Sequence, residues 1–317
     1  MFEATEYELI DFGNGRKLER FGAALVDRPS PAATSFSPAE PDRWSEATAR
    51  FGTARHDSAR HDSARSSDDA RNQWHGRAES AAAIEPDEQP WAVRHGATRF
   101  LLRRSESGNV GLFPEQAANW DWIADQVASA REVLSSPPRV LNLFAYTGGA
   151  SLAAAAVGAE VVHVDSSAPT VTWARQNAEA SGLTEAPVRW LVEDAVKFVQ
   201  REAKRGNRYH GIIADPPTYG HGPKGKAFKI EDQLPRLMAM CGELLALSVA
   251  GTSPGFLVFS CHAPGFGPTR AANTLSDALA SSADAAGSGS VEALRLMLRT
   301  RDGRELPAGV GARWSTA

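Results

Sequence analysis

The stretch from Pro138 to Gly149, PRVLNLFAYTGG, constrains the fold of this chain more than any other part of the sequence. Its apolar run, Val140 to Phe144, is too short for a typical helix and suits a buried strand. The strand runs into YTGG, and the alanine-rich segment ASLAAAAVG follows. A strand, a glycine turn and a helix in this order let the backbone approach a ligand closely, and the helix start offers free N–H groups.

Two carboxylates follow the next two predicted strands. The run EVVHVD ends at Asp165, about 20 residues past the turn, where α/β nucleotide folds place an acid on a ribose diol. Asp194 follows the third strand and is a candidate acceptor for an adenine amino group. The alternative interpretation of both residues is that they only cap the helices that follow. The turn fits neither G-x-G-x-x-G nor a P-loop, which disfavours NAD, FAD and P-loop ATP hydrolysis.

From residue 138 onward, strand and helix patterns alternate, which predicts a parallel sheet. The last two strands have no helix between them, so we expect a hairpin in which one strand is antiparallel to the rest. The predicted fold class is α/β, with a Rossmann-like seven-stranded sheet and a small β-rich N-terminal extension. The predicted strands are 139–145, 160–165, 188–193, 209–215, 255–261, 291–300 and 309–315, and the predicted helices are 149–157, 168–181, 194–205, 231–249 and 268–284.

The residues before the sheet divide by composition. Residues 1–28 and 89–113 are predicted to form a β-rich piece, and 114–317 the main domain. Residues 29–88 are rich in Ser, Ala, Asp and Arg and include the repeat ARHDSARHDSAR, so we expect a disordered insertion. Its histidines could suggest metal binding, but no cysteine or second cluster completes a site, and no metal is predicted.

Charge and cysteine content restrict the partners and the compartment. The net charge is −4, so a generally basic surface is absent and any nucleic-acid contact must be local. Two cysteines form no disulfide framework and suit a reducing cytosol. The sequence shows no signal peptide and no apolar run long enough to cross a bilayer, so a cytoplasmic protein is expected.

The fourth and fifth predicted strands end in residues whose side chains could take part in catalysis. The fourth ends in IIADPPTYG, where Pro216 and Pro217 fix the backbone beside the Asp215 carboxylate. The fifth ends at Cys261, which we expect to face the same crevice as Asp215. The alternative for this cysteine is a small buried core residue, which is how Cys241 is interpreted outright.

The combination of NLFAYTGG, VDSS, WARQNAE, EDA and DPPTYG resembles class I S-adenosylmethionine-dependent methyltransferases. It is most similar to bacterial enzymes that make 5-methylcytosine or 7-methylguanine in large-subunit ribosomal RNA, and the similarity covers about residues 109–262. The resemblance implies S-adenosylmethionine as cofactor and Asp215 facing the target base. It also implies a cofactor site in which Asp165 holds the ribose, Ser166 and Asp194 hold the adenine, and the methionine part is wrapped by Phe144, Tyr146, Thr147, Gly148 and Gly149.

Cys261 falls where the 5-methylcytosine enzymes carry a cysteine. Carbon 5 of cytosine is a poor nucleophile, and a thiolate that adds to carbon 6 makes it reactive toward a methyl donor. The leading hypothesis is therefore methylation of cytosine carbon 5 in RNA, with Cys261 as nucleophile. The resemblance implies that this RNA is ribosomal RNA. DPPT followed by an aromatic residue also resembles the 7-methylguanine enzymes, which need no nucleophile.

A basic loop, PKGKAFK, follows DPPTYGHG directly. Lys224, Lys226 and Lys229 could neutralise RNA phosphates, although an ordinary solvated loop is an equally good interpretation. The rival functions are a nitrogen-directed RNA methyltransferase without covalent catalysis, a non-catalytic protein of the same fold that binds RNA or a partner, and a small-molecule methyltransferase. An intact cofactor turn disfavours the non-catalytic alternative.

Overall fold

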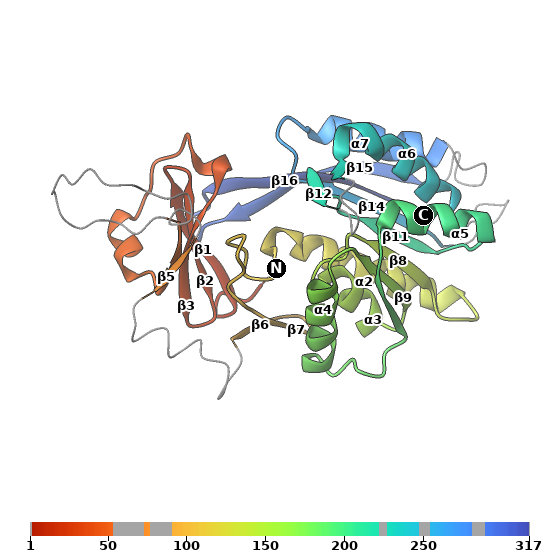
Figure 1. Ribbon diagram of the computed structural model, residues 1–317, viewed down its shortest axis with the longest axis horizontal. Coiled ribbons are helices and arrows are strands. Elements are labelled where there is room, and N and C mark those ends of the chain that lie inside the picture. Colours follow the sequence, from red (N-terminus) through yellow and green to blue (C-terminus); the bar gives the residue numbers. More distant parts are fainter. Residues whose placement is uncertain are drawn as a thin grey trace. The chain divides into compact units, whose positions relative to one another are not determined.

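The computed structural model describes residues 2–52, 73–76, 91–221, 227–246, 254–280 and 289–316 (Figure 1). The chain divides into two compact units. The first comprises Met1–Pro114 and Met297–Pro307, and the second comprises Glu115–Leu296 and Ala308–Ala317. Because the division crosses the last two strands, the C-terminal part of the chain contributes to both units.

The first unit is built on a five-stranded sheet in the order β1-β2-β3-β4-β5. Tight turns with positive-φ residues, among them Asn14, Gly15 and Gly22, connect the first three strands as antiparallel hairpins. A separate antiparallel pair, β6 with β7, turns at Gly96. The strands are Tyr7–Gly13 (β1), Arg16–Phe21 (β2), Ala24–Pro29 (β3), Ala49–Phe51 (β4), Trp74–Gly76 (β5), Ala92–His95 (β6) and Thr98–Leu101 (β7).

A buried carboxylate, Asp11 of β1, organises one end of this unit. Its Oδ2 accepts a hydrogen bond from Trp44 Nε1 at 2.8 Å, and its Oδ1 accepts one from Arg304 Nη1 at 2.6 Å. An isolated parallel bridge also joins Leu9 to Thr300. Residues from the two ends of the sequence therefore complete the same unit.

The prediction of disorder over residues 29–88 is wrong for the part of that range which the structure describes. Short 3₁₀ helices, Pro31–Ala33 (η1) and Pro41–Glu46 (η2), precede strand β4, and β5 lies further along. The sequence looked too polar to fold, but Trp44 is only 7% exposed and bonds to Asp11. This aromatic side chain, together with the buried Phe51 of β4, holds the segment against the sheet. Residues 53–72 and 77–90, which include the repeat, lie outside the described residues.

The second unit contains the predicted seven-stranded sheet, in the order β10-β9-β8-β11-β14-β16-β15. Strands β10, β9, β8, β11 and β14 pair in parallel, and β16 is antiparallel to β14, as the sequence predicts for the final hairpin. The strands are Arg139–Leu143 (β8), Glu160–Asp165 (β9), Val188–Val192 (β10), Gly211–Ala214 (β11), Phe256–Cys261 (β14), Ser290–Arg299 (β15) and Glu305–Ser315 (β16).

Helices cover both faces of this sheet (Figure 1). Helices α2, α3 and α4 lie on one face, and α5, α6 and α7 lie on the other. The expected helix 231–249 is shorter than predicted, because it ends at Glu243. The helices are Ala117–Val133 (α2), Gly149–Ala156 (α3), Ala168–Ala180 (α4), Ala195–Arg205 (α5), Ile230–Glu243 (α6) and Pro268–Ala280 (α7), and Pro114–Gln116 (η5) leads into α2.

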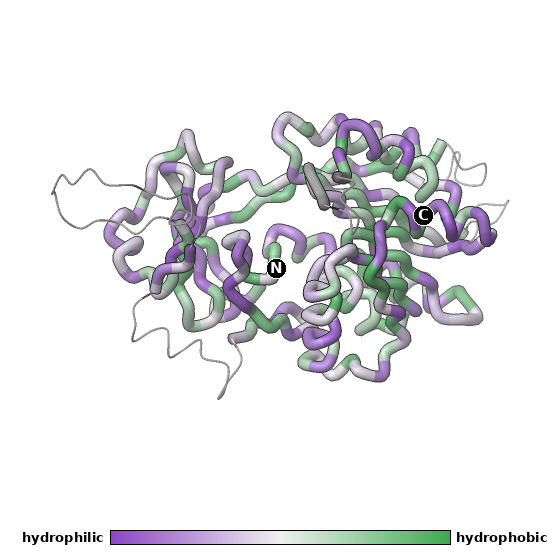
Figure 2. The backbone as a smooth tube through the Cα atoms, viewed as in Figure 1, coloured by the Kyte–Doolittle hydropathy of each residue, from purple (hydrophilic) through white to green (hydrophobic). Residues whose placement is uncertain are grey.

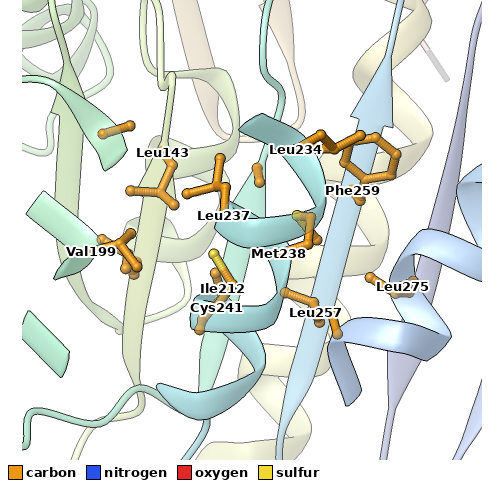
Figure 3. Packing of buried hydrophobic residues seen from close by; sticks show 14 of the residues in the cluster. Leu143, Val199, Ile212, Leu234, Leu237, Met238, Cys241, Leu257, Phe259 and Leu275 are labelled. Carbon is orange, nitrogen blue, oxygen red and sulfur yellow. The ribbon is translucent and has the colours of Figure 1, made fainter. Parts of the chain in front are cut away.

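The core lies between the sheet and these helices. The central strands are hydrophobic in Figure 2, whereas α5 carries a strongly polar outer face. Figure 3 shows Leu237, Met238 and Cys241 of α6 packed with Ile212 and Leu257 of the sheet. Cys241 is fully buried, and burial raises the pKa of its thiol to about 12. This cysteine is therefore an apolar core residue, as predicted.

Candidate functional site: the carboxyl edge of the sheet

The turn after β8 has the unusual backbone that the sequence suggests. Phe144 and Tyr146 both adopt positive φ, at 55° and 49°, although neither is glycine. Gly148, with φ 94°, is the N-cap of α3. Left-handed backbone at bulky residues costs energy, and such residues concentrate at ligand sites. The turn is a candidate binding loop on these grounds.

Tight packing holds the turn in place. The carbonyl of Thr147 accepts a hydrogen bond from Asn177 Nδ2 of α4 at 2.9 Å. A Cβ at Gly149 would lie 2.6 Å from the buried ring of Trp120. A glycine at this position therefore allows the turn to pack closely against α2. We expected this glycine to favour a ligand, and the structure shows that at least part of its role is internal packing.

Asp165, at the end of β9, is tied directly to the turn. Its Oδ2 accepts the backbone N–H of Tyr146 at 2.9 Å, and its Oδ1 accepts that of Ser167 at 2.9 Å. Burial raises the pKa of this carboxyl above its ordinary value, and the backbone N–H groups oppose that shift. Each oxygen keeps acceptor capacity. The N-cap of α4 is Ser167 rather than Asp165, which excludes the simple capping role for the aspartate.

The two other predicted adenine-site residues differ in their surroundings. Ser166 is exposed next to Asp165. Asp194 is the N-cap of α5, and its Oδ1 accepts the backbone N–H of Lys197 at 3.0 Å. Capping therefore occupies one oxygen of Asp194, and its role toward adenine stays a prediction. The neighbouring Glu193 N–H donates to the Asp165 carbonyl at 2.9 Å, so these two strand ends lie side by side.

Asp215 follows β11, on the other side of β8 from Asp165. Because β9, β8 and β11 are parallel neighbours, the two carboxylates and the turn share the carboxyl edge of the sheet. Ligands of open α/β sheets bind outside this edge. Pro216 is buried and Pro217 is exposed, so the pair anchors the backbone on one side and presents it on the other.

A chain of side chains that the sequence did not reveal supports Asp215. Gln116 Nε2 donates to Asp215 Oδ2 and to Ser260 Oγ, both at 3.1 Å. Asn119 Nδ2 donates to Gln116 Oε1 at 2.6 Å, and Arg313 of β16 donates to Asn119 Oδ1 at 2.9 and 2.6 Å. Arginine can only donate, so it fixes the orientation of both amides and the direction of the whole chain. No spacing rule links residues this far apart in sequence.

Cys261 and Asp215 lie on opposite faces of the sheet, whereas we expected them to face the same crevice. Cys261 packs in the cluster formed with α6 and α7, as do Leu257 and Phe259 two and four residues earlier. Ser260, between them, bonds to Gln116 on the α2 side. Strand alternation explains the separation, because successive side chains point to opposite faces. The sequence prediction placed both residues at the right edge but did not apply this alternation to the last strand residue.

The thiol of Cys261 is also buried, at 1% exposure. Burial is the main cause of a raised pKa for this thiol, and the negative charge of Asp215 adds to it. The N–H of Ala263 donates to Sγ at 3.3 Å and partly opposes the shift. Reactive cysteines usually have lowered pKa values and accessible sulfur.

The basic loop is only partly described. After Asp215-Pro216-Pro217 the chain forms an antiparallel pair, Tyr219–His221 (β12) with Ala227–Lys229 (β13). Lys229 is exposed and is the N-cap residue of α6. Lys224 and Lys226 lie outside the described residues, so their role stays a prediction. Over the described ranges, no group of three or more His, Cys, Asp or Glu is placed to hold a metal ion, and no helix is long and apolar enough to cross a bilayer.

Comparison with known proteins shows the family to which the chain belongs. A family model described as S-adenosylmethionine-dependent methyltransferase matches residues 55–268. The chain belongs to this methyltransferase family. A structure of the SAM-dependent methyltransferase from Agrobacterium tumefaciens is 34% identical, with a TM-score of 0.81 over 99% of this chain and 91% of that one. A SAM-dependent methyltransferase from Streptococcus mutans, 15% identical, shares the fold, with a TM-score of 0.67 over 98% of this chain and 75% of that chain.

Curated relatives match over a shorter range. Ribosomal RNA large subunit methyltransferase I of Aeromonas salmonicida is 29% identical over 58% of this chain and 47% of its own length. Ribosomal RNA large subunit methyltransferase K/L of Hahella chejuensis is 33% identical over 53% of this chain and 21% of its own length. The chain therefore spans less than half the length of these curated relatives.

The residues at the edge fit S-adenosylmethionine, the cofactor of this methyltransferase family. The Asp165 carboxylate is partly buried and held by two backbone N–H groups, and each oxygen retains a lone pair for a ribose hydroxyl. The turn from Phe144 to Gly149 leads into the N-terminus of α3. The same acid is therefore fixed in orientation before any ligand arrives, as a preorganised site requires.

Proposed function

We propose that this methyltransferase modifies a base of RNA, with ribosomal RNA as the substrate class. The observation that supports this most directly is that Asp165 and Asp215 flank the turn after β8 at one sheet edge. One acid suits the cofactor ribose, and the other, beside Pro216 and Pro217, suits the hydrogen-bonding edge of a base. The ribosomal RNA substrate is suggested by the names of the curated relatives.

When bound, S-adenosylmethionine supplies a methyl group on a positively charged sulfur. The chain's own residues would hold the ribose through Asp165 and orient the target through Asp215. The Gln116 amide would keep Asp215 Oδ2 occupied, so that the carboxylate has one fixed orientation. Positioning of this kind supplies much of the rate in a transfer that needs two groups in line.

The geometry supports a nitrogen target better than carbon 5 of cytosine. The carbon 5 route needs an accessible, partly ionised thiol. Cys261 is 1% exposed, its pKa is raised by burial, and it lies on the face of the sheet opposite Asp215. A nitrogen target needs no nucleophile and uses Asp215 directly. Cytosine carbon 5 stays the second candidate, because Cys261 does end β14 at the same edge and the charge of Asp215 acts on its thiol.

A Cys261→Ser variant separates the two chemistries. For a nitrogen target, we expect it to methylate RNA within about threefold of the unaltered chain, because the thiol takes no part. The substrate would be RNA from a strain that lacks the gene, and nucleoside mass spectrometry would locate the methyl group. RNA carrying 5-fluorocytosine should form no complex that survives a denaturing gel. Loss of turnover together with trapping in the unaltered chain would establish cytosine carbon 5 instead.

Changing Lys224, Lys226 and Lys229 together to Ala should weaken RNA binding at low salt. If the three lysines contact phosphates, the slope of log affinity against log salt should fall by about 2. The matched control changes Lys204, Arg205 and Arg208, which lie at or beyond the end of α5 and so at the opposite edge of the sheet. Equal slopes in the lysine variant and the unaltered chain would show that the loop is merely solvated.

A further inference from the structure

Arg313 of β16 begins a hydrogen-bond relay that runs through two amides and ends on Asp215. Its Nε and Nη2 donate to Asn119 Oδ1 at 2.9 and 2.6 Å. Asn119 Nδ2 donates in turn to Gln116 Oε1 at 2.6 Å, and Gln116 Nε2 donates to Asp215 Oδ2 at 3.1 Å. Each amide of the relay therefore accepts from the side of the arginine and donates toward the carboxylate.

The burial of the two amides makes this direction hard to reverse. Asn119 is 2% exposed and Gln116 is 7% exposed, so solvent water does not replace a missing partner. If both amides turned over, the NH₂ group of Asn119 would face the guanidinium, and the oxygen of Gln116 would face the Asp215 carboxylate. A buried donor or acceptor without a partner is costly. Because a guanidinium holds donors only, Arg313 selects one direction for the whole relay.

Other contacts hold the guanidinium of Arg313 in place. Nη2 also donates to the carbonyl of Ala118 at 2.7 Å, and Cζ lies 5.3 Å from the ring centre of Trp122 on the same helix. The backbone of Arg313 is fixed by the sheet, because it pairs with Val258 of β14. Contacts with the sheet and with α2 therefore place the arginine.

We propose that Arg313 is a remote positioning residue for methyl transfer, and that Asn119 and Gln116 carry its effect to Asp215. The inference rests on the proposed function, in which Asp215 orients the target base. Gln116 presents its NH₂ group to Asp215, so the carboxylate is held as a hydrogen-bond acceptor and suits an N–H group of the base. Arg313 touches neither cofactor nor substrate in this scheme and acts only through the relay.

The functional test compares single-turnover methyl transfer by the unaltered chain, Arg313→Met and Asn119→Asp. The methionine has a similar length but no donor, whereas Asp at 119 still pairs with Arg313 but cannot donate to Gln116. We expect either change to slow transfer by about 10- to 100-fold, because Asp215 loses its fixed orientation. The affinity for S-adenosylhomocysteine should stay within threefold. Arg313→Lys keeps a donor for Asn119 and should be at least about threefold faster than Arg313→Met.

Arg299→Met is the matched control for these variants. Arg299 lies on the neighbouring strand β15, pairs with Glu305 at 2.8 Å and is 64% exposed, so its loss should leave the rate unchanged. Melting curves show which variants fold, and Asn119→Asp decides the test if Arg313→Met does not, because it preserves a partner for Arg313. A rate within threefold of the unaltered chain in folded Asn119→Asp would overturn the proposal, as would a loss of cofactor affinity as large as the loss of rate.

A spectroscopic arm tests the relay independently of activity. In chain labelled with ¹⁵N in its glutamine side chains, the amide signals lost in Gln116→Met identify Gln116. We expect these signals to shift in Asp215→Asn and in Asn119→Asp but not in Arg299→Met. Unchanged signals in the first two variants would overturn the proposal even if the chain methylates RNA. If the unaltered chain methylates no RNA, the proposed function fails, while this arm still decides whether the relay holds Asp215.

Discussion

Asp165→Ala is expected to weaken S-adenosylhomocysteine binding by at least about 100-fold. The carboxylate of Asp165 is partly buried, and backbone N–H groups of Tyr146 and Ser167 fix its orientation. Each charge-assisted bond to a ribose hydroxyl contributes roughly 1.5 to 3 kcal/mol, and two of them are lost together. Isothermal titration calorimetry measures the change directly.

An Asp125→Ala variant is the control for this experiment, since Asp125 is exposed on α2. It should bind S-adenosylhomocysteine as the unaltered chain does. A melting curve without ligand shows whether Asp165→Ala remains folded, because the substitution also releases the N–H groups of the turn. If the folded variant binds within threefold of the unaltered chain, Asp165 does not hold the ribose.

The second large effect concerns acid stability and comes from His163 on β9. Its Nδ1 lies 3.0 Å from Ser151 Oγ, and its Nε2 is buried without a partner. Burial lowers the pKa of His163 to about 3, and the charge of Arg175 adds to the shift. Below pH 6.5 the unfolded chain binds a proton here and the folded chain does not, until the pH approaches 3. The free energy of unfolding should therefore fall by about 2 kcal/mol between pH 7 and pH 5 on account of this residue.

Denaturant unfolding of the unaltered chain and His163→Gln at both pH values isolates this contribution. Other groups titrate in the same range, including His210, whose pKa burial also lowers. They are common to both proteins, so the difference between the two pH dependences belongs to His163. We expect the variant to be less stable at pH 7 but to lose less stability on acidification. Identical pH dependences would show that His163 titrates alike in the folded and unfolded chains.

The sequence was sufficient to predict the sheet and the glycine turn after β8, because both are local patterns. The run from Val140 to Phe144 and the run that ends at Asp165 become β8 and β9 nearly as predicted. Their apolar residues are buried between two helical layers, so hydrophobicity and spacing alone identify them. The antiparallel β16 followed from the absence of a helical pattern between the last two strands.

The support of Asp215 could not be predicted in the same way. Gln116 and Arg313 are almost two hundred residues apart in sequence and meet only through the order of the sheet and the placement of α2. The sheet face on which the Cys261 side chain lies depends on the strand register to within one residue. The hydrophobic pattern of the sequence does not fix the register that closely. Trp44 shows a third limit, since a few buried residues, Trp44 and Phe51 among them, suffice to order a segment whose composition is typical of disorder.

The bond between Asp11 and Arg304 spans 293 residues, which has a consequence for how the protein is made. During synthesis β1 to β3 leave the ribosome long before Thr300 and Arg304, which complete their unit. The first unit is therefore finished only after the second unit's sheet strands β8 to β14 have been made, and the segment that finishes it leads directly into β16 of the other sheet. Removal of residues 297–317 would leave both units unfinished, so the two cannot be separated by a simple truncation before β16.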